Sequence, residues 1–256
     1  MNRPGGAGPD HVAAIARRLV QSYRQHAPVR ATPASGPAHP EAAYAVQQAV
    51  WQAMAGCERP RAWKVGASAR DAVPTAAPVF PSRLAAGPAR YPAGLFMAPG
   101  IEAEIALRFG QDLPPRPDAY SRGEILAAIE GAYVAMEIVD TRLADPEAAG
   151  PHWRLADNLL NGALVLGEPI PHWRDLDWAD QHVQVMLDGE ALPGLTGRPP
   201  LDDLFHCLPW WLAHVGGART GDIVTTGAWS GMHPAAQATR LAVLFTGLGG
   251  AEAVIG

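Results

Sequence analysis

The amino-acid sequence predicts an α+β protein in which a small helical N-terminal part leads into a mixed, β-rich body. Two segments before residue 62 carry apolar residues at helical spacing, whereas the chain from Trp63 onward has short apolar runs separated by glycine and proline. The 27 glycines and 25 prolines among 256 residues predict many turns, and 48% apolar residues suffice for a substantial core. We expect a helical segment over 1–62 and a β-rich body over 63–256.

The helical part is predicted to contain two helices. Residues 1–9 are expected to form a frayed terminus, and Asp10 is expected to be the N-cap of the first helix. The stretch 27–40 holds four prolines and is predicted to be a connecting loop. The second amphipathic helix is expected from Glu41 to Met54, ending near Gly56.

Short apolar runs and alternating patterns predict the strands of the body, which are 101–109, 133–139, 162–166, 183–187, 223–226, 241–245 and a further one near Ala253. The pair Asp188-Gly189 predicts a hairpin turn. A capping box at Ser121-Arg-Gly-Glu124 predicts a helix to about Gly131. Because Pro209 interrupts a helical pattern over 201–215, we expect a kink or two short helices there.

Charge and composition exclude several classes of protein. The net charge of −5 gives no electrostatic support for nucleic-acid binding, and no apolar run approaches the roughly 18 residues that span a bilayer. The start of the chain lacks the apolar stretch of a secretory signal. Cys57 and Cys207 match no metal-binding or redox spacing. We expect a cytoplasmic enzyme that acts on a small molecule, with no nucleic-acid or membrane partner.

Two carboxylates are predicted to share one face of the strand 101–109. Side chains two residues apart in a strand point the same way, so Glu102 and Glu104 should lie side by side and repel unless a cation or proton separates them. Glu137 stands inside an apolar strand, where a buried charge must be paired or bind a metal. Three converging carboxylates favour Mg²⁺ or Mn²⁺ over Zn²⁺.

Simpler interpretations of these carboxylates stay open. Glu102 and Glu104 can equally belong to a solvated strand face, because charged residues are usually exposed. Glu137 can form an ion pair with Arg142. Asp140 can also pair with Arg142, and we expect that pair to be structural and to hold the turn after the strand.

Lys64 is the second candidate for chemistry. It stands in Trp63-Lys-Val-Gly66, where apolar neighbours can partly desolvate its ammonium and suit it to acid–base work or to stabilising an oxyanion. The alternative is a surface lysine whose aliphatic stem lies over Trp63.

Two polar loops flank predicted strands. The segment Asp157-Asn158-Leu-Leu-Asn161-Gly162 leads into the predicted strand and offers amide groups. The segment 225–234 offers hydroxyls and backbone N–H groups that can hold a carboxylate or enolate oxygen. Such turns are common in β proteins, so each loop alone is weak evidence. His233 is expected to be structural, and the pair Trp210-Trp211 is expected to lie in the core.

The order of the motifs resembles that of a known family. The segments are Ala43-Tyr-Ala-Val-Gln47, Trp63-Lys-Val-Gly66, Glu102-Ala-Glu104, Glu137-Ile-Val-Asp140, Asp157-Asn158, Gly221-Asp-Ile-Val-Thr-Thr-Gly227 and the closing Gly247-Leu-Gly249. From about residue 40 to the C-terminus, the chain resembles the 2-keto-4-pentenoate hydratase family. That family belongs to the fumarylacetoacetate hydrolase superfamily and also contains the 4-oxalocrotonate decarboxylases.

The resemblance implies a mixed β-roll and a Mg²⁺ or Mn²⁺ ion, which a 2-oxo acid would chelate through its carboxylate and 2-oxygen. The resemblance also implies that the lysine would handle protons or stabilise the enolate. The site residues that it implies are the metal ligands Glu102, Glu104 and Glu137, the catalytic Lys64, and the substrate-binding Asn158, Thr226 and Gly227.

We therefore expect a metal-dependent lyase that adds water to a 2-hydroxy-2,4-dienoate and yields a 4-hydroxy-2-oxoacid, in the catabolism of aromatic-derived compounds. The alternatives are a decarboxylase of a 2-oxo-enedioate, an acylpyruvate C–C hydrolase and a non-catalytic partner subunit. Two departures separate the chain from the hydratases: Leu160 and Asn161 stand where serines are usual, and the segment 77–81 lacks an acid. We expect a homo-oligomer, with a related decarboxylase or hydratase as a further partner.

Overall fold

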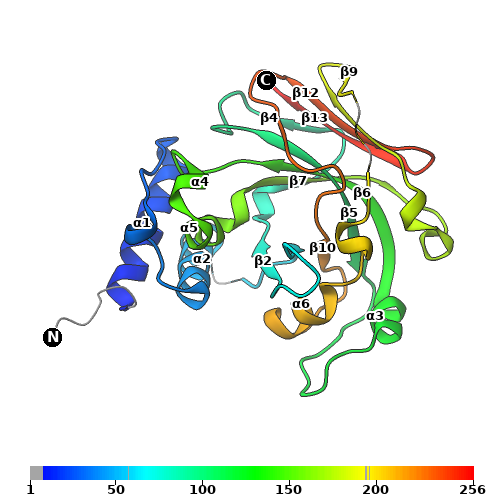
Figure 1. Ribbon diagram of the computed structural model, residues 1–256, viewed down its shortest axis with the longest axis horizontal. Coiled ribbons are helices and arrows are strands. Elements are labelled where there is room, and N and C mark those ends of the chain that lie inside the picture. Colours follow the sequence, from blue (N-terminus) through cyan, green and yellow to red (C-terminus); the bar gives the residue numbers. More distant parts are fainter. Residues whose placement is uncertain (1–7, 57, 194, 196) are drawn as a thin grey trace.

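The computed structural model describes residues 8–56, 58–193, 195 and 197–256. Cys57 and most of the expected frayed terminus therefore lie outside the described residues. The chain forms a curled, β-rich body with two long helices at its N-terminal side (Figure 1). In this part of the chain, no helix is both long and apolar enough to cross a membrane.

The N-terminal helices are α1 (Pro9–Gln25) and α2 (Pro40–Ala55), which pack against each other. The prediction of an N-cap at Asp10 was wrong, because α1 begins at Pro9, whose fixed φ suits the first turn of a helix. Asp10 lies in that first turn, where its negative charge interacts favourably with the free backbone N–H groups of the helix N-terminus. The end of α2 before Gly56 is confirmed.

The strands among the described residues are β1 (Ala62–Gly66), β2 (Thr75–Pro78), β3 (Leu84–Ala86), β4 (Ala89–Tyr91), β5 (Gly100–Phe109), β6 (Ile129–Val139), β7 (Asn161–Pro169), β8 (Val183–Leu187), β9 (Glu190–Ala191), β10 (Ile223–Thr225), β11 (His233–Pro234), β12 (Arg240–Phe245) and β13 (Gly249–Ile255). The shorter helices are α3 (Arg122–Ala128), α4 (Pro146–Ala149), α5 (Pro151–Ala156) and α6 (Leu208–Val215). Short 3-10 helices cover Pro33–Ser35, Pro81–Arg83, Asn158–Leu160, Trp173–Asp175, Trp178–Asp180 and Pro200–Asp202.

The described strands form two sheets. The larger one has the order β2-β1-β10-β5-β6-β7-β3, with β11 paired to β5, and the smaller one has the order β4-β13-β12-β8-β9. Most neighbours are antiparallel, but β1 runs parallel to β10 and β3 to β7 in the larger sheet, and β4 runs parallel to β13 in the smaller one. The sheets are therefore mixed, as predicted.

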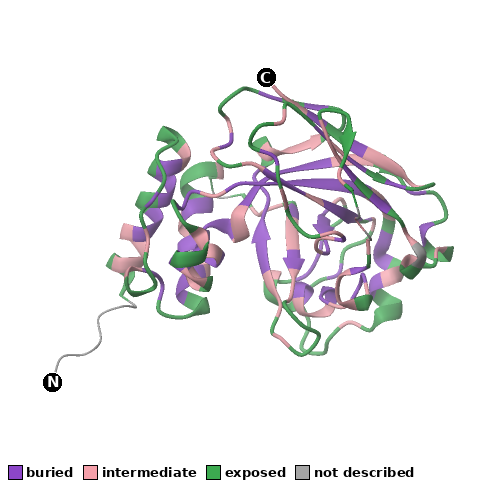
Figure 2. Cartoon of the chain, turned by 45° about the horizontal axis from the view of Figure 1, so that its top comes forward, coloured by how far each residue is buried: buried purple, intermediate pink, exposed green. Residues whose placement is uncertain are grey.

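The main core lies between the two sheets. Ile105, Met136 and Val165 of the larger sheet pack in one cluster with Val185 and Val243 of the smaller sheet, and all five are at most 1% exposed. Figure 2 shows the buried residues concentrated along the strands and between the helices. Burying an aliphatic side chain of this size stabilises the fold by about 1.5–3 kcal/mol, so this cluster holds the sheets together.

A second core lies under the N-terminal helices. Leu19 of α1 and Val46 of α2 pack in one cluster with Trp153 of α5 and with Phe80 of the body. The helical region therefore includes residues 146–156 in addition to the N-terminal segment. The division of the chain at 62/63 stays a prediction.

The helix that follows Ser121 is shorter than predicted. Its capping box is confirmed, because Ser121 and Glu124 bond reciprocally to each other's backbone N–H groups. The helix ends at Ala128 rather than near Gly131, because Ile129 already pairs with Phe109 in the antiparallel ladder of β5 and β6. The pattern over 201–215 resolves into two short helices, with Pro209 in the first turn of α6.

Candidate metal and substrate site

Strand pairing brings three carboxylates together on the larger sheet. Glu102 on β5 lies opposite Glu137 on β6, and Glu104 follows two residues along the same face. One carboxylate oxygen of each residue lies within 4.8 Å of the others. The intervening Ala103 and the neighbouring Met136 belong to the main core, so the carboxylates point away from that core.

The carboxylates are buried and largely without hydrogen-bond partners. Glu104 and Glu137 are 1% and 0% exposed, and Glu102 is partly buried. Both oxygens of Glu104 and Oε2 of Glu137 have no partner among the described residues. Burial raises the pKa of Glu104 well above its usual range, with the charges of Glu137 and Glu102 adding to the effect, and burial raises the pKa of Glu137 to about 7.

This donor set fits a hard divalent cation. Such ions prefer carboxylate oxygens, and a bound cation would satisfy the unpartnered oxygens and offset the repulsion between the three charges. The alternative of a solvated strand face is wrong for Glu104, which is almost completely inaccessible. The arrangement can hold an ion of the Mg²⁺ type, and Glu102 is the most exposed of the three carboxylates.

Lys64 pairs with the carboxylate cluster. Its Nζ lies 2.6 Å from Glu137 Oε1 and donates to the carbonyl oxygen of Leu159 at 3.2 Å. Burial alone would lower the pKa of Lys64, but the charges of Glu137, Glu102 and Glu104 outweigh it, so the pKa is raised. The alternative of a surface lysine lying over Trp63 is therefore wrong. In addition, Lys64 is the only lysine in the sequence, a signal that the motif analysis missed.

The partners expected for Glu137 and Arg142 are corrected by the structure. Lys64, not Arg142, pairs with Glu137. Arg142 Nε lies 2.6 Å from Asp157 Oδ1, whereas its Nη1 is 4.0 Å from Asp140 Oδ2. Asp140 instead accepts from the backbone N–H groups of residues 97 and 98. The expected Asp140–Arg142 pair is therefore present as a long ion pair, whereas the shorter bonds of Glu137 and Arg142 go to Lys64 and Asp157 in other segments of the chain.

Asn161 reaches the cluster, although the sequence placed it only in an amide-bearing loop and not among the site residues. Its Nδ2 donates to Glu137 Oε1 at 3.0 Å, while its Oδ1 is buried without a partner among the described residues. The predicted Asn158 is also buried, but its Nδ2 donates to the carbonyl oxygen of Pro78 at 2.7 Å. A signal was available, because Asn161 is a polar residue at the start of a buried strand.

Thr225 is the last residue of β10, and Thr226 follows it directly. Thr225 lies opposite Lys64 in the pairing of β10 with β1. The hydroxyls of Thr225 and Thr226 are buried without a partner among the described residues. Gly227 follows with a φ of +109°, a conformation that glycine adopts readily. Thr225 belongs to the polar segment 225–234 that the sequence singled out, but only Thr226 and Gly227 were predicted as substrate-binding residues.

His233 and the segment 77–81 make contacts that stabilise the fold. His233 lies on β11 opposite Ile101, and its Nε2 is 3.0 Å from the carbonyl oxygen of Ser230. The segment 77–81 contains no acidic residue; its Val79 and Phe80 are buried, and Phe80 stacks on Trp51.

The tryptophan pair divides between two environments. Trp211 lies in the core at 0% exposure, as predicted. Trp210 is only partly buried and stacks on His214. The expectation of a core pair therefore holds in full for Trp211 alone.

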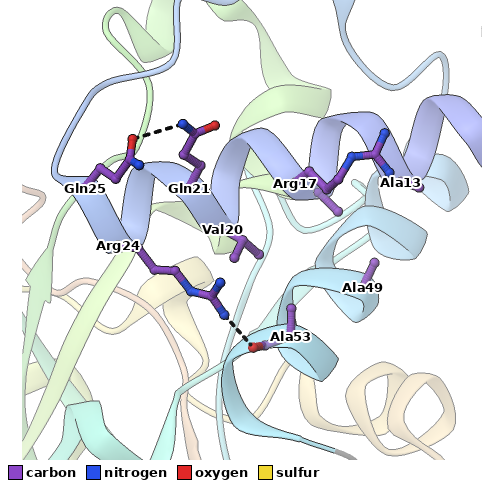
Figure 3. Close-up of a pocket in the computed structure, with 9 residues that line it drawn as sticks. Ala13, Arg17, Val20, Gln21, Arg24, Gln25, Ala49 and Ala53 are labelled. Carbon is purple, nitrogen blue, oxygen red and sulfur yellow. Dashed lines mark hydrogen bonds between the residues drawn. The ribbon is translucent and has the colours of Figure 1, made fainter.

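A groove of about 580 Å³ lies apart from these residues, between α1 and α2 (Figure 3). Its floor is formed by Val20, Ala49 and Ala53, and Arg17 and Arg24 project along it. Arg24 donates to the carbonyl oxygen of Ala53 at 3.4 Å. None of the three carboxylates lines this groove, so it is separate from the candidate site.

The fold and the cluster together define a class of protein, a mixed β-roll whose larger sheet carries three clustered carboxylates beside a lysine. The chain belongs to the fumarylacetoacetate hydrolase C-terminal family, whose sequence pattern matches residues 25–253.

Curated relatives are hydratases by name. The chain is 30% identical over 173 residues to 2-keto-4-pentenoate hydratase 2 of Dechloromonas aromatica (strain RCB), covering 63% of this chain and 62% of that protein. It is 28% identical over 168 residues to 2-hydroxyhexa-2,4-dienoate hydratase of Comamonas testosteroni, covering 61% and 60%. The matched region therefore spans less than two thirds of the length of these relatives.

Solved structures confirm the fold. The 4-oxalocrotonate decarboxylase from Pseudomonas putida G7, complexed with magnesium and adipate, superimposes with a TM-score of 0.81 at 20% identity, covering 97% of this chain and 98% of that chain. The 2-hydroxyhepta-2,4-diene-1,7-dioate isomerase from Mycobacterium marinum superimposes with a TM-score of 0.53 at 16% identity, covering 78% and 76%. At these identities the likeness establishes the fold alone.

Proposed function

We propose that this protein is a metal-dependent hydratase that adds water to a 2-hydroxy-2,4-dienoate and forms a 4-hydroxy-2-oxoacid, in the catabolism of aromatic-derived compounds. The observation that carries the proposal is the cluster of Glu102, Glu104 and Glu137 with Lys64 bonded to its edge. The names of the relatives supply the substrate class.

We assign Glu102, Glu104 and Glu137 as ligands of Mg²⁺ or Mn²⁺. Buried carboxylate oxygens that no protein group satisfies support this assignment. When bound, the cation supplies Lewis acidity at the carboxylate and 2-oxygen of a 2-oxo acid. Asn161 donates a hydrogen bond to Glu137 and so helps to fix the orientation of that carboxylate.

Lys64 handles the charge of the enolate in this proposal. Ketonisation moves the proton of the 2-hydroxyl to C5 of the dienoate, which leaves a conjugated enone; water then adds at C4 and C3 takes a proton. The ammonium of Lys64 balances the negative charge that develops on the 2-oxygen and holds a proton at Nζ for these transfers. Its bonds to Glu137 and to the carbonyl oxygen of Leu159 keep Nζ beside the carboxylates.

The loops contribute substrate binding. The buried Thr226 hydroxyl and the backbone N–H of Gly227 are proposed to contact the substrate, because that hydroxyl has no partner among the described residues. Asn158 contributes through the Pro78 carbonyl oxygen, which ties the segment 77–81 to the site. That the chain forms a homo-oligomer, and associates with a related decarboxylase or hydratase, stays a prediction for sedimentation and co-purification experiments.

The test is a panel assay with purified protein and Mg²⁺, in which dienol absorbance and CO₂ release are followed together. We expect loss of the dienol absorbance of 2-hydroxypenta-2,4-dienoate, formation of the 4-hydroxy-2-oxoacid, and no CO₂. Absence of turnover for every dienoate, oxo-enedioate and acylpyruvate would instead support a non-catalytic subunit.

Decarboxylation of a 2-oxo-enedioate is the second candidate. The decarboxylase superimposes over nearly the whole chain, and the segment 77–81 lacks an acid that could activate water. CO₂ release from 4-oxalocrotonate, without hydration of the monocarboxylic dienoate, would assign this activity instead.

A further inference from the structure

A strained stretch of chain precedes β7. Asn158, Leu159 and Leu160 have φ values of +59°, +51° and +60°. Residues with a Cβ atom rarely adopt this left-handed region, and three in succession are disfavoured. Something in the surrounding structure must therefore hold this conformation.

The strained stretch serves the candidate site at two points. The carbonyl oxygen of Leu159 accepts from Lys64 Nζ at 3.2 Å. Immediately after the stretch, Asn161 Nδ2 donates to Glu137 Oε1 at 3.0 Å. A relaxation of the stretch would move both groups, so its conformation determines where Lys64 and Glu137 lie.

The guanidinium group of Arg142 forms hydrogen bonds to the residues on both sides of the stretch. Arg142 Nη2 donates to the carbonyl oxygen of Asp157 at 2.7 Å, and its Nη1 donates to the carbonyl oxygen of Asn161 at 3.0 Å. Its Nε also donates to Asp157 Oδ1 at 2.6 Å. The planar fork of arginine suits this arrangement, which a single ammonium cannot reproduce.

The guanidinium is itself held in place. Arg142 is 1% exposed, and its Cζ lies 4.4 Å from the ring centroid of Tyr23 on α1. Asp157 Oδ2 accepts from the backbone N–H of Arg142 and from Thr141 Oγ1, both at 2.9 Å. Ser22 donates to the carbonyl oxygen of Arg142 at 3.3 Å. Helix α1 thus supports the guanidinium group of Arg142.

We propose that Arg142 is a positioning residue of the active site, which acts by clamping the left-handed stretch 158–160 between the carbonyl oxygens of Asp157 and Asn161. The stretch in turn places the Leu159 carbonyl oxygen at Lys64 and the Asn161 amide at Glu137. This inference rests on the proposed function for its kinetic readout, but metal binding tests it independently of substrate.

The first variant is Arg142→Lys, which keeps the positive charge beside Asp157 and removes the fork. We expect kcat to fall about 10- to 100-fold and Mn²⁺ affinity, measured by electron paramagnetic resonance, to fall about tenfold, the effects typical of groups that orient metal ligands. KM should change less than kcat, because Arg142 itself is buried and contacts no substrate. Wild-type kcat and Mn²⁺ affinity in this variant would overturn the proposal.

The second variant tests the strain directly. Leu160→Gly lets position 160 adopt a positive φ without steric conflict, and Leu160 is only partly buried. Added to Arg142→Lys, this change should recover most of the lost Mn²⁺ affinity and kcat. A double variant as impaired as Arg142→Lys alone would contradict a clamp that works against backbone strain.

The control is Val50→Ala, which removes core volume under the same helices and leaves the clamp intact. If its melting temperature is as low as that of Arg142→Lys, Val50→Ala should still bind Mn²⁺ with wild-type affinity. An equal loss of Mn²⁺ affinity in Val50→Ala and Arg142→Lys would show that Arg142 has only a structural role. If Arg142→Lys does not fold, Thr141→Val replaces it, because it removes one bond to Asp157. Because Lys64 is the only lysine in the sequence, its ¹³Cε NMR signal can be observed alone in lysine-labelled protein. This signal should shift in Thr141→Val, and an unchanged chemical shift would overturn the proposal.

The proposed function can fail separately from the clamp. Wild-type protein that binds Mn²⁺ but turns over no dienoate would refute the hydratase activity, and the affinity of Arg142→Lys would still decide on the clamp. If wild-type protein binds no Mn²⁺, the assignment of the metal ligands fails. The ¹³Cε NMR signal of Lys64 in Thr141→Val then decides whether the clamp exists.

Discussion

Glu104 is the carboxylate in the cluster with the fewest satisfied interactions. Both of its oxygens are buried without a partner among the described residues, and burial, with the charges of Glu137 and Glu102, raises its pKa. We expect Glu104→Gln to melt at or above the wild-type temperature in a chelator, because a neutral isostere relieves the repulsion. The melting-temperature increase on adding Mg²⁺ should shrink, because one anionic ligand is lost.

Differential scanning calorimetry with and without Mg²⁺ measures both effects. Glu190→Gln on the exposed β9 is the control and should leave both melting temperatures unchanged. A metal-free Glu104→Gln protein that melts far below wild type would show that the Glu104 charge is needed for folding.

Lys64 carries the charge balance of the proposed reaction. Because its Nζ is bonded to Glu137 and to a backbone carbonyl oxygen, we expect Lys64→Ala to lower kcat by about two to four orders of magnitude, the range of acid–base groups. KM should rise only modestly, since the work of Lys64 lies in the transition state. Steady-state kinetics on the folded variant measure this.

Metal binding provides a check on the same variant. Removal of a positive charge 2.6 Å from Glu137 cannot weaken cation binding by electrostatics, so Mn²⁺ affinity should not fall. A kcat within about twofold of wild type would remove Lys64 from the proposed mechanism.

At the scale of elements, two strands approach each other very closely. A Cβ atom built on Gly167 in β7 would overlap the backbone carbonyl oxygen of Gly250 in β13. Backbone cannot yield as a flexible side chain can, so Gly167→Ala should lower the free energy of unfolding by about 1–3 kcal/mol. Urea denaturation measures this.

Gly123 provides the matched control for that substitution. It lies in α3, and a Cβ atom there would meet no atom within 4 Å. Gly123→Ala should therefore leave stability unchanged or raise it by up to about 1 kcal/mol through helix propensity. Equal effects of the two changes would contradict a close approach of β7 and β13.

Strands with regular patterns were predictable, and short strands with small residues were not. The alternation in β5 and the apolar run in β6 identified both strands within a few residues. In contrast, β2 covers Thr75–Pro78, where small residues and proline carry no strand pattern. Its pairing with β1 exists because β1 offers a free edge, which is a property of the sheet rather than of the segment.

For the whole molecule, metal dependence is the decisive expectation. Excess EDTA should abolish activity, and added Mg²⁺ or Mn²⁺ should restore it, because the three candidate ligands include no Cys or His. A ligand that binds the folded state alone at about 100 times its Kd stabilises it by about 2.7 kcal/mol, so the melting temperature should also rise. Full activity in EDTA, with no metal detected by elemental analysis, would refute the metal site.

The sequence by itself determined the fold class, the pairing face of Glu102 and Glu104, and the candidacy of Glu137 and Lys64, because strand periodicity and buried charge are local signals. Tertiary structure alone decided which charges meet. Lys64 joins Glu137, and Arg142 joins Asp157 and the carbonyl oxygen of Asn161, across segments that only the folded sheet and helices bring together. Partner choice depends on three-dimensional distance and shared burial, and neither is written in sequence spacing.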